Sequence, residues 1–198
     1  MSLLAITKWN YDRNGLARDP KLEREMLDEE ALEFKLGLID FIRDDNLFKL
    51  EAMVEMIDAY CDFSFVYTGT IAKQISASDW IDEEKRMMYM NTYIIEGLFK
   101  HGVQIFDGNG KSVIDEANDA VIEANEAKPV KKTMHKVLKG DDWKDPKDLI
   151  LDLLKARGWN DDTDAVADAR AKDRANTNNG GTLEDFQAQF QEEEAPSE

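Results

Sequence analysis

The sequence predicts an all-α protein, and three observations carry that prediction. Proline, the strongest helix breaker, stands at positions 20, 129, 146 and 196, so the chain between Pro20 and Pro129 contains none. Apolar residues in that stretch recur at spacings of three and four, which is the period of one helix face. A strong turn signal, Asp107-Gly108-Asn109-Gly110, interrupts the pattern. We therefore predict a body of helices separated by turns.

Composition limits the classes of protein to consider. The chain has 198 residues, 42% of them hydrophobic, which is enough for one domain with a sizeable core. The net charge of −17 argues against direct nucleic-acid binding or an anionic membrane surface, since phosphate backbones attract Lys and Arg. No apolar run is long enough for a membrane span. The single cysteine, Cys61, fits a reducing compartment, so we expect a cytoplasmic protein.

The chain divides into three predicted parts. Residues 1–19 hold few helix signals and are expected to form an extended N-terminal arm. Residues 20–158 form the helical domain. Residues 159–198 are expected to be a flexible, largely disordered acidic tail, because residues 160–198 hold 11 acidic and 3 basic side chains and few large apolar groups.

The first two helices of the domain are the most clearly patterned. Pro20 opens the first at a position that proline tolerates, and Leu27, Ala31, Phe34, Leu38 and Phe41 form its apolar stripe. Asp44-Asp45-Asn46 is expected to cap the second. The stripe of that second helix consists of Leu50, Val54, Ile57, Cys61 and Phe65.

The later helices follow from the same signals. A third helix is predicted over about 79–106 and a fourth over about 111–127, ended by Pro129. A lysine-rich segment over 128–140 comes next, and a short helix is predicted over 145–156. His101 and His135 are interpreted as ordinary surface histidines, because no His/Cys cluster suggests a zinc site.

Two acidic pairs are the candidate site. Glu30 and Glu33 lie on one face of the first helix, and Glu55 and Asp58 lie on one face of the second. The second pair belongs to a ridge of four, Glu51, Glu55, Asp58 and Asp62, without a basic residue to offset it. Carboxylate oxygens suit Mg²⁺, with Mn²⁺ as an alternative, and such ions act on phosphates. The alternative to a metal site is a solvated acidic face with a purely structural role.

Other residues can complete a phosphate site. Glu29 or Asp62 can accept a proton from water. Lys128 and Lys139 can hold phosphates as point charges, and Asn125, one turn before Lys128, faces the same way. Trp9 can stack on a base, although packing over the core is the stronger expectation.

The order and spacing of these motifs resemble a family. Met26 to Phe34, a 21-residue spacer from Phe34 to Val54, and Glu55-Met56-Ile57-Asp58 resemble the all-α NTP pyrophosphohydrolases, the MazG-like and dimeric dUTPase group, with its E-x-x-E and E-x-x-D pairs. The segment from Val121 to Lys128, followed by Lys139-Gly140 and Pro146, is similar to the closing segment of phage-type MazG-like proteins. The family's usual serine in this segment is replaced by Ala127 here.

The resemblance implies a four-helix-bundle-type MazG-like fold, a homodimer or homotetramer, and Mg²⁺-dependent hydrolysis of a nucleoside triphosphate, in particular a dNTP, to the monophosphate and pyrophosphate. A phage-encoded member would act in the host cytoplasm. The implied metal ligands are Glu30, Glu33, Glu55 and Asp58, with Glu29 as ligand or base. Asn125, Lys128 and Lys139 are the implied contacts to phosphate or sugar.

Two other functions remain open at this point. An acidic helical protein with an acidic tail can bind a basic partner without catalysis, as a mimic of nucleic acid. The same fold can also act on a different triphosphate, phosphoribosyl-ATP. Neither the preferred base nor the choice between dimer and tetramer follows from the sequence.

Overall fold

Six helices build the part of the chain that the structure, a computed structural model, describes: residues 3–14, 19–43, 49–73, 81–128 and 143–160. The all-α prediction is confirmed there, since the β pairing in these residues is an isolated bridge between Phe106 and Ser112. In order the helices are α1 (Leu3–Asn14), α2 (Pro20–Ile42), α3 (Leu50–Lys73), α4 (Ile81–Lys100), α5 (Val113–Glu126) and α6 (Pro146–Ala156). All six belong to one compact unit, Met1–Asp161.

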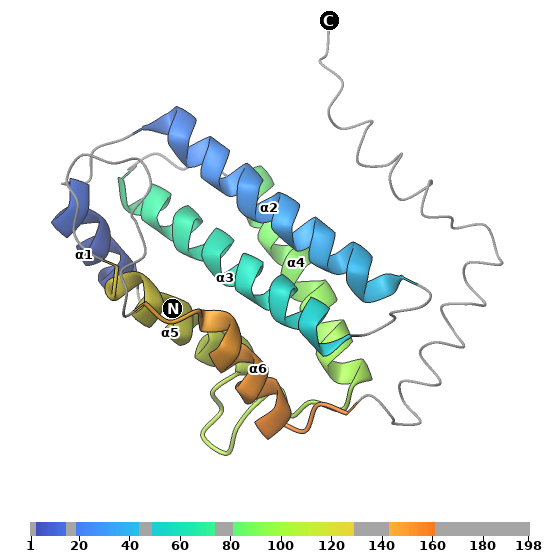
Figure 1. Cartoon of the computed structure of the whole chain (residues 1–198). Coiled ribbons are helices and arrows are strands. Elements are labelled where there is room, and N and C mark those ends of the chain that lie inside the picture. The colour runs from blue at the N-terminus through green and yellow to red at the C-terminus, as the bar shows by residue number, and fades with distance from the viewer. Residues whose placement is uncertain (1–2, 15–18, 44–48, 74–80, 129–142, 161–198) are drawn as a thin grey trace, which may run out of the picture. The chain divides into compact units, whose positions relative to one another are not determined.

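Helix α3 is the centre of this unit. It packs against each of the other five helices, and Figure 1 shows it running between α2 on one side and α5 and α6 on the other. Its predicted stripe is buried from Val54 to Phe65, but Met53, Met56 and Phe63 on its other sides are fully buried as well. A helix that is apolar on most sides is a core helix. Burying each such side chain stabilises the fold by roughly 1.5–3 kcal/mol.

Helix α2 packs on α3 through the stripe predicted for it, whose five residues are all buried. The helix begins where expected, with Pro20 in its first turn and the Asp19 side chain accepting a hydrogen bond from the Leu22 amide. The two helices approach closely at Gly37. A Cβ atom there would lie 3.0 Å from Met56 Cγ, 3.3 Å from the Met56 backbone nitrogen and 3.4 Å from the Ala52 carbonyl oxygen.

Replacing Gly37 by leucine is expected to destabilise the fold by about 1–3 kcal/mol, because an added side chain would force α2 away from the α3 backbone. Urea unfolding followed by circular dichroism measures the change. The neighbouring Leu36→Ala substitution is the control, since Leu36 is 54% exposed and its loss should stay within about 0.5 kcal/mol. Equal stability of Gly37→Leu and the wild type would contradict the close packing.

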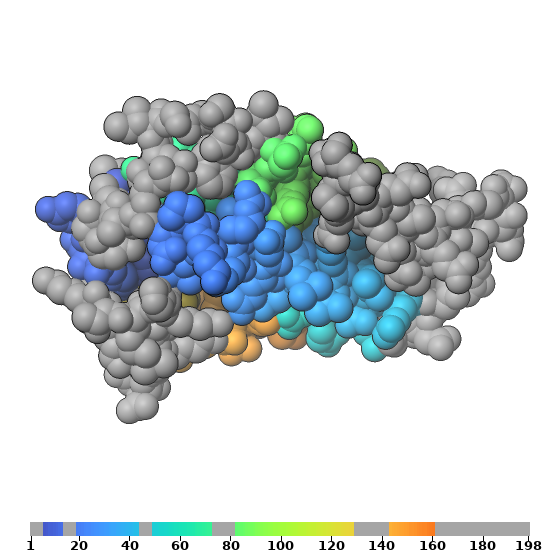
Figure 2. All heavy atoms as spheres, turned by 90° about the horizontal axis from the view of Figure 1, so that it is seen from above, coloured from blue at the N-terminus to red at the C-terminus, as the bar shows by residue number. Residues whose placement is uncertain are grey.

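Helix α4 is joined to α2 by charged side chains. Glu83 is 1% exposed and pairs with Arg24 of α2, while Arg86 lies 3.5 Å from Glu83 and 2.9 Å from Asp28. Figure 2 shows α2 along this face of the molecule with α4 beside it. A buried carboxylate needs such partners, since removing one would leave a charge unpaired at a cost of several kcal/mol.

Helix α4 ends six residues before the predicted end at Phe106. Gly102 has φ of 68°, and its amide donates to the Phe99 carbonyl at 3.0 Å while the Val103 amide donates to the Leu98 carbonyl at 3.0 Å. This is a Schellman ending, which glycine favours because it adopts positive φ without strain. The apolar residues after Gly102 continued the sequence pattern but belong to the following loop.

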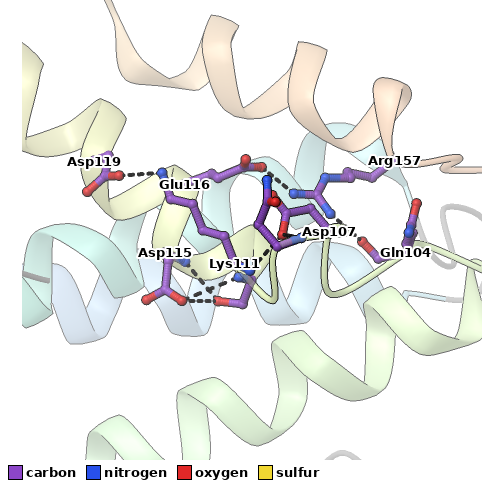
Figure 3. A network of polar contacts seen from close by, with 9 residues as sticks. Gln104, Asp107, Lys111, Asp115, Glu116, Asp119 and Arg157 are labelled. Carbon is purple, nitrogen blue, oxygen red and sulfur yellow. Dashed lines mark hydrogen bonds and ion pairs between the residues drawn. The ribbon is translucent and has the colours of Figure 1, made fainter.

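The loop between α4 and α5 is held by a polar network (Figure 3). Asp107 accepts hydrogen bonds from the amides of Asn109 and Lys111, which confirms the predicted turn. Lys111 pairs with Asp119 at 2.6 Å, and Arg157 after α6 pairs with Glu116 at 2.7 Å. Ser112 and Asp115 form a capping box, so α5 begins at Val113.

The extended conformation predicted for the N-terminal arm is wrong, because Leu3–Asn14 is helix α1. Asn10 is buried, and its side-chain amide donates to the Ile6 carbonyl at 3.0 Å. Ile6 is also buried, and α1 packs on α3. A weak local preference for helix is therefore overridden by tertiary contacts, which sequence pattern does not reveal.

The interpretation of His101 as a surface residue is also wrong. Its side chain is fully buried, its Nδ1 lies 3.1 Å from the Asn160 carbonyl oxygen, and its ring stacks on Trp159 with centroids 3.8 Å apart. Trp159 follows α6, whose start after Asp145 and end at Ala156 match the prediction. The stack therefore joins the end of α6 to the end of α4.

Several predictions fall on residues that the structure does not describe. These are the Asp44–Asn46 cap, the lysine-rich segment of 128–140 from residue 129 onward, with His135 and Lys139, and the acidic tail from residue 161. Among the helices that are described, none has the length and apolar character needed to cross a membrane.

Candidate functional site

The hairpin of α2 and α3 brings one member of the first acidic pair, Glu30, near Asp58 of the second pair and near Asp62. Gly37 of α2 lies against Met56 of α3, and Glu30, about two turns earlier in α2, lies near Asp62, later in α3, so the two helices run antiparallel. Glu33 precedes Gly37 by one turn, and Glu30 lies nearly one turn further back. Glu30 therefore meets the later part of the α3 ridge, Asp58 and Asp62, beyond Glu55.

Glu30 is the residue of α2 most affected by this meeting. Burial and, after it, the charge of Asp62 raise the pKa of Glu30 to about 8, with Glu33, Glu29 and Asp58 adding to the effect. Each of these neighbours is a like charge that opposes ionisation. The prediction that Glu30 borders the buried face is confirmed, since its side chain is neither buried nor fully exposed.

Asp58 is the most buried member of the ridge, with a side chain that is 9% exposed. Burial raises its pKa to about 7, and Asp62 adds to this effect while the ammonium of Lys147 opposes it. Its Oδ1 atom is buried and has no hydrogen-bond partner among the described residues. Such an atom usually costs free energy, and a bound cation would satisfy it.

Lys147 of α6 is a site residue that the sequence reasoning missed. Its ammonium donates to Glu55 Oε2 at 2.6 Å and lies 3.7 Å from Asp58 Oδ2. The acidic ridge has no basic residue at helical spacing on α3, so part of its charge is balanced by Lys147 of α6. The contact spans 92 positions of the sequence, so no local pattern indicates it.

Lys147 is held in place by the start of α6. The Asp145 side chain accepts a hydrogen bond from the Lys147 amide at 3.0 Å and caps the helix. Pro146, between them, is buried. The charge of Asp145 also contributes to the raised pKa of Asp58, so the start of α6 lies beside the α3 ridge.

Three further predicted residues, Trp9, Asn125 and Lys128, form a second group where α1 meets the end of α5. Lys128 donates to Asn125 Oδ1 at 2.7 Å, which confirms that the two face the same way. Asn125 is buried and donates through Nδ2 to the Val121 carbonyl at 3.0 Å. Arg13, which the sequence reasoning missed, donates to the Lys128 carbonyl at 2.8 Å and to the Asn125 carbonyl at 3.3 Å.

Trp9 belongs to this second group. It packs over the core, as expected in preference to stacking on a base. Its ring meets Phe65 of α3 edge to face with centroids 5.1 Å apart, and Arg13 lies 4.1 Å from its centroid on the ring face. The indole nitrogen donates to the Asn125 carbonyl at 2.8 Å. Phe65 follows Asp62 by three residues, so this group lies about one turn of α3 beyond the carboxylate cluster.

The carboxylates of this cluster are donors that suit a divalent cation. Hard cations take carboxylate oxygens, and the unpartnered Asp58 Oδ1, together with the carboxylates near Glu30, fits such an ion. In the described part of the chain, no three acidic, His or Cys side chains are already grouped closely enough to hold a metal. Binding would therefore require side-chain movement, beginning with the carboxylates that Lys147 contacts.

The chain has no significant match among protein-family models, curated proteins or solved structures. The resemblance to the MazG-like group is therefore carried by the motifs and their spacing.

Proposed function

We propose that this protein hydrolyses a nucleoside triphosphate, in particular a dNTP, to the monophosphate and pyrophosphate with the help of Mg²⁺, as a member of the MazG-like group. The observation that supports this most is the meeting of Glu30 of α2 with Asp58 and Asp62 of α3 across the α2–α3 hairpin. Burial raises the pKa values of Glu30 and Asp58, and the neighbouring carboxylates raise them further. A bound divalent cation would offset the repulsion within such a carboxylate cluster more fully than water does.

The proposed ligands are Glu30, Glu33, Glu55 and Asp58, and Mg²⁺ bound by them would stabilise the charge that develops on the phosphates. Glu29 or Asp62 would accept a proton from the attacking water. The water oxygen forms a bond to the α-phosphorus, the bond from that phosphorus to the bridging oxygen breaks, and pyrophosphate leaves. Lys128 and Lys139 are proposed to hold the leaving phosphates, and Asn125 to orient Lys128 through their hydrogen bond.

A panel of dNTPs, NTPs and phosphoribosyl-ATP, assayed with Mg²⁺, with Mn²⁺ and with a chelator, tests the proposal. Pyrophosphate as the first product and loss of turnover with the chelator are expected. In water labelled with a heavy oxygen isotope, the label should enter the monophosphate, because the attack is on the α-phosphorus. Orthophosphate as first product would contradict the proposal, and no turnover on any triphosphate would favour a non-catalytic protein that binds a basic partner.

We also propose a homodimer, and the outward face of α4 supports it. Met88 and Phe99 on that helix are 70% and 76% exposed, and Ile95 between them is partly exposed. Exposed apolar side chains aligned on one helix face commonly mark an interface. Light scattering should give twice the 22.6 kDa chain mass, and Phe99→Glu should shift it toward the monomer. A monomeric wild type would contradict this proposal without affecting the catalytic one.

A further inference from the structure

Lys147 contacts the same carboxylates that the proposed metal would need. Its ammonium is 2.6 Å from Glu55 Oε2 and 3.7 Å from Asp58 Oδ2, which are the two members of the E-x-x-D pair. The other oxygen of Asp58 is buried and has no hydrogen-bond partner among the described residues. The Lys147 ammonium therefore balances part of the charge of Glu55 and Asp58 and leaves Asp58 Oδ1 without a hydrogen bond.

The surroundings of Lys147 allow its ammonium to leave without disturbing the fold. Its side chain is 33% exposed and that of Glu55 is 50% exposed, so the ion pair lies at the rim of the unit. Asp58, at 9% exposed, marks the inner end of the pair. The backbone of Lys147 is fixed by the Asp145 cap. A divalent cation bound by Glu55 and Asp58 would repel the ammonium by several kcal/mol at short range, so both cannot keep the same carboxylates.

We infer that Lys147 is the resident counter-ion of the E-x-x-D pair, that a divalent cation must displace its ammonium, and that the displaced ammonium then binds the phosphates of the nucleotide. This inference rests on the proposed metal site, and it adds a phosphate-binding residue that the family motifs do not supply. It also predicts coupling between the two ligands. Metal alone has to displace an ammonium that gains no new partner, whereas metal and triphosphate together provide one.

Linkage makes this coupling reciprocal: the triphosphate strengthens metal binding by the same factor as the metal strengthens triphosphate binding. Lys147→Met keeps most of the apolar stem and removes the charge. Without nucleotide, this variant should bind Mn²⁺ about fivefold more tightly than the wild type, as expected from a half-exposed ion pair worth about 1 kcal/mol. The factor by which the triphosphate strengthens Mn²⁺ binding should be smaller in Lys147→Met than in the wild type.

The measurement is electron paramagnetic resonance of free Mn²⁺, recorded with the full chain at constant ionic strength. It is made without nucleotide and with a triphosphate whose α–β bridging oxygen is replaced by an imido group, after subtraction of the Mn²⁺ bound by that nucleotide. Lys111→Met is the matched control, because Lys111 also pairs with a carboxylate at 2.6 Å but belongs to the network of Figure 3. Lys147→Arg keeps the charge and should retain the coupling.

Two results would overturn the inference. The first is equal Mn²⁺ affinity of Lys147→Met and wild type without nucleotide, and the second is an unchanged coupling factor. If Lys147→Met loses its helical circular dichroism, Lys147→Gln is measured in its place. A wild type that binds no Mn²⁺ but hydrolyses triphosphates would overturn the metal site and this inference together. A wild type that binds Mn²⁺ with the predicted coupling but shows no turnover would overturn the proposed function and leave the inference standing.

Discussion

Replacing Asp58 by asparagine is expected to abolish turnover and, at the same time, to stabilise the metal-free protein. Turnover should fall by about a hundredfold or more, because a metal ligand contributes several kcal/mol to transition-state stabilisation. Stability should rise by about 1–3 kcal/mol at pH 8, since burial and the Asp62 charge oppose the ionised form of Asp58, and an amide carries no charge. Opposite signs for activity and stability are unusual for a core substitution and are typical of a functional site.

Glu55→Gln is the informative comparison. It should also abolish turnover, but it should leave stability within about 1 kcal/mol of the wild type, because Glu55 is half-exposed and loses only its pair with Lys147. Asp119→Asn, in the network of Figure 3, is the control and should keep full turnover. Pyrophosphate release measures activity, and thermal unfolding in the presence of a chelator measures stability. Full activity in Asp58→Asn would show that the site lies elsewhere.

The metal-free protein is expected to lose stability as the pH rises from about 4 to about 8. Glu30 and Asp58 have folded-state pKa values of about 8 and about 7, above their ordinary values of 4.5 and 3.8. The folded state therefore holds protons that the unfolded state has released, and the slope of unfolding free energy against pH is negative in this range. The stability that protonation provides is complete below about pH 4 and is lost once the pH passes about 8. The total change from the two groups should be roughly 2–4 kcal/mol.

Urea unfolding at a series of pH values, with a chelator present, measures this dependence. The Glu30→Gln/Asp58→Asn double variant should flatten the curve between pH 4 and 8, which separates these two groups from the other carboxylates of the chain. Millimolar Mg²⁺ should raise stability more at pH 8 than at pH 5, because the metal binds the ionised carboxylates. An identical pH dependence of wild type and double variant would show that the two carboxylates are not crowded in solution.

The fold was predictable wherever periodicity and caps agree. The stripe of α2 was identified residue by residue, and α6 begins directly after its Asp145 cap. Gly102 indicates the end of α4, but the apolar residues after it continue the helical spacing, so the predicted end was too late. Helix α1 carried no such signal, because Trp9 and Arg13 hold it through hydrogen bonds to the end of α5 that exist only in the folded chain.

The site was predictable to the extent that it depends on two consecutive helices. Residues three apart share a face, and the hairpin connection of α2 to α3 makes the faces meet, so Glu30 and Asp58 could be associated from the sequence. Which residue of the α3 ridge meets Glu30 depends on the register of the two helices, which is set at Gly37. Among the neighbouring carboxylates, Asp62 has the largest effect on the pKa of Glu30, and Glu55 is not among them. The contact of Lys147 with this site could not be predicted from the sequence, because only tertiary packing brings α6 to α3.

The position of Lys147 in the sequence also bears on the order in which the molecule folds. The α2–α3 hairpin is built from contacts between neighbouring segments, which close small loops and form early, whereas the Lys147–Glu55 contact closes a loop across 92 positions. We expect the chain to bring its like charges together before the balancing ammonium arrives. The repulsion would then slow the folding step, and loss of Lys147 would appear mainly as faster unfolding in stopped-flow measurements.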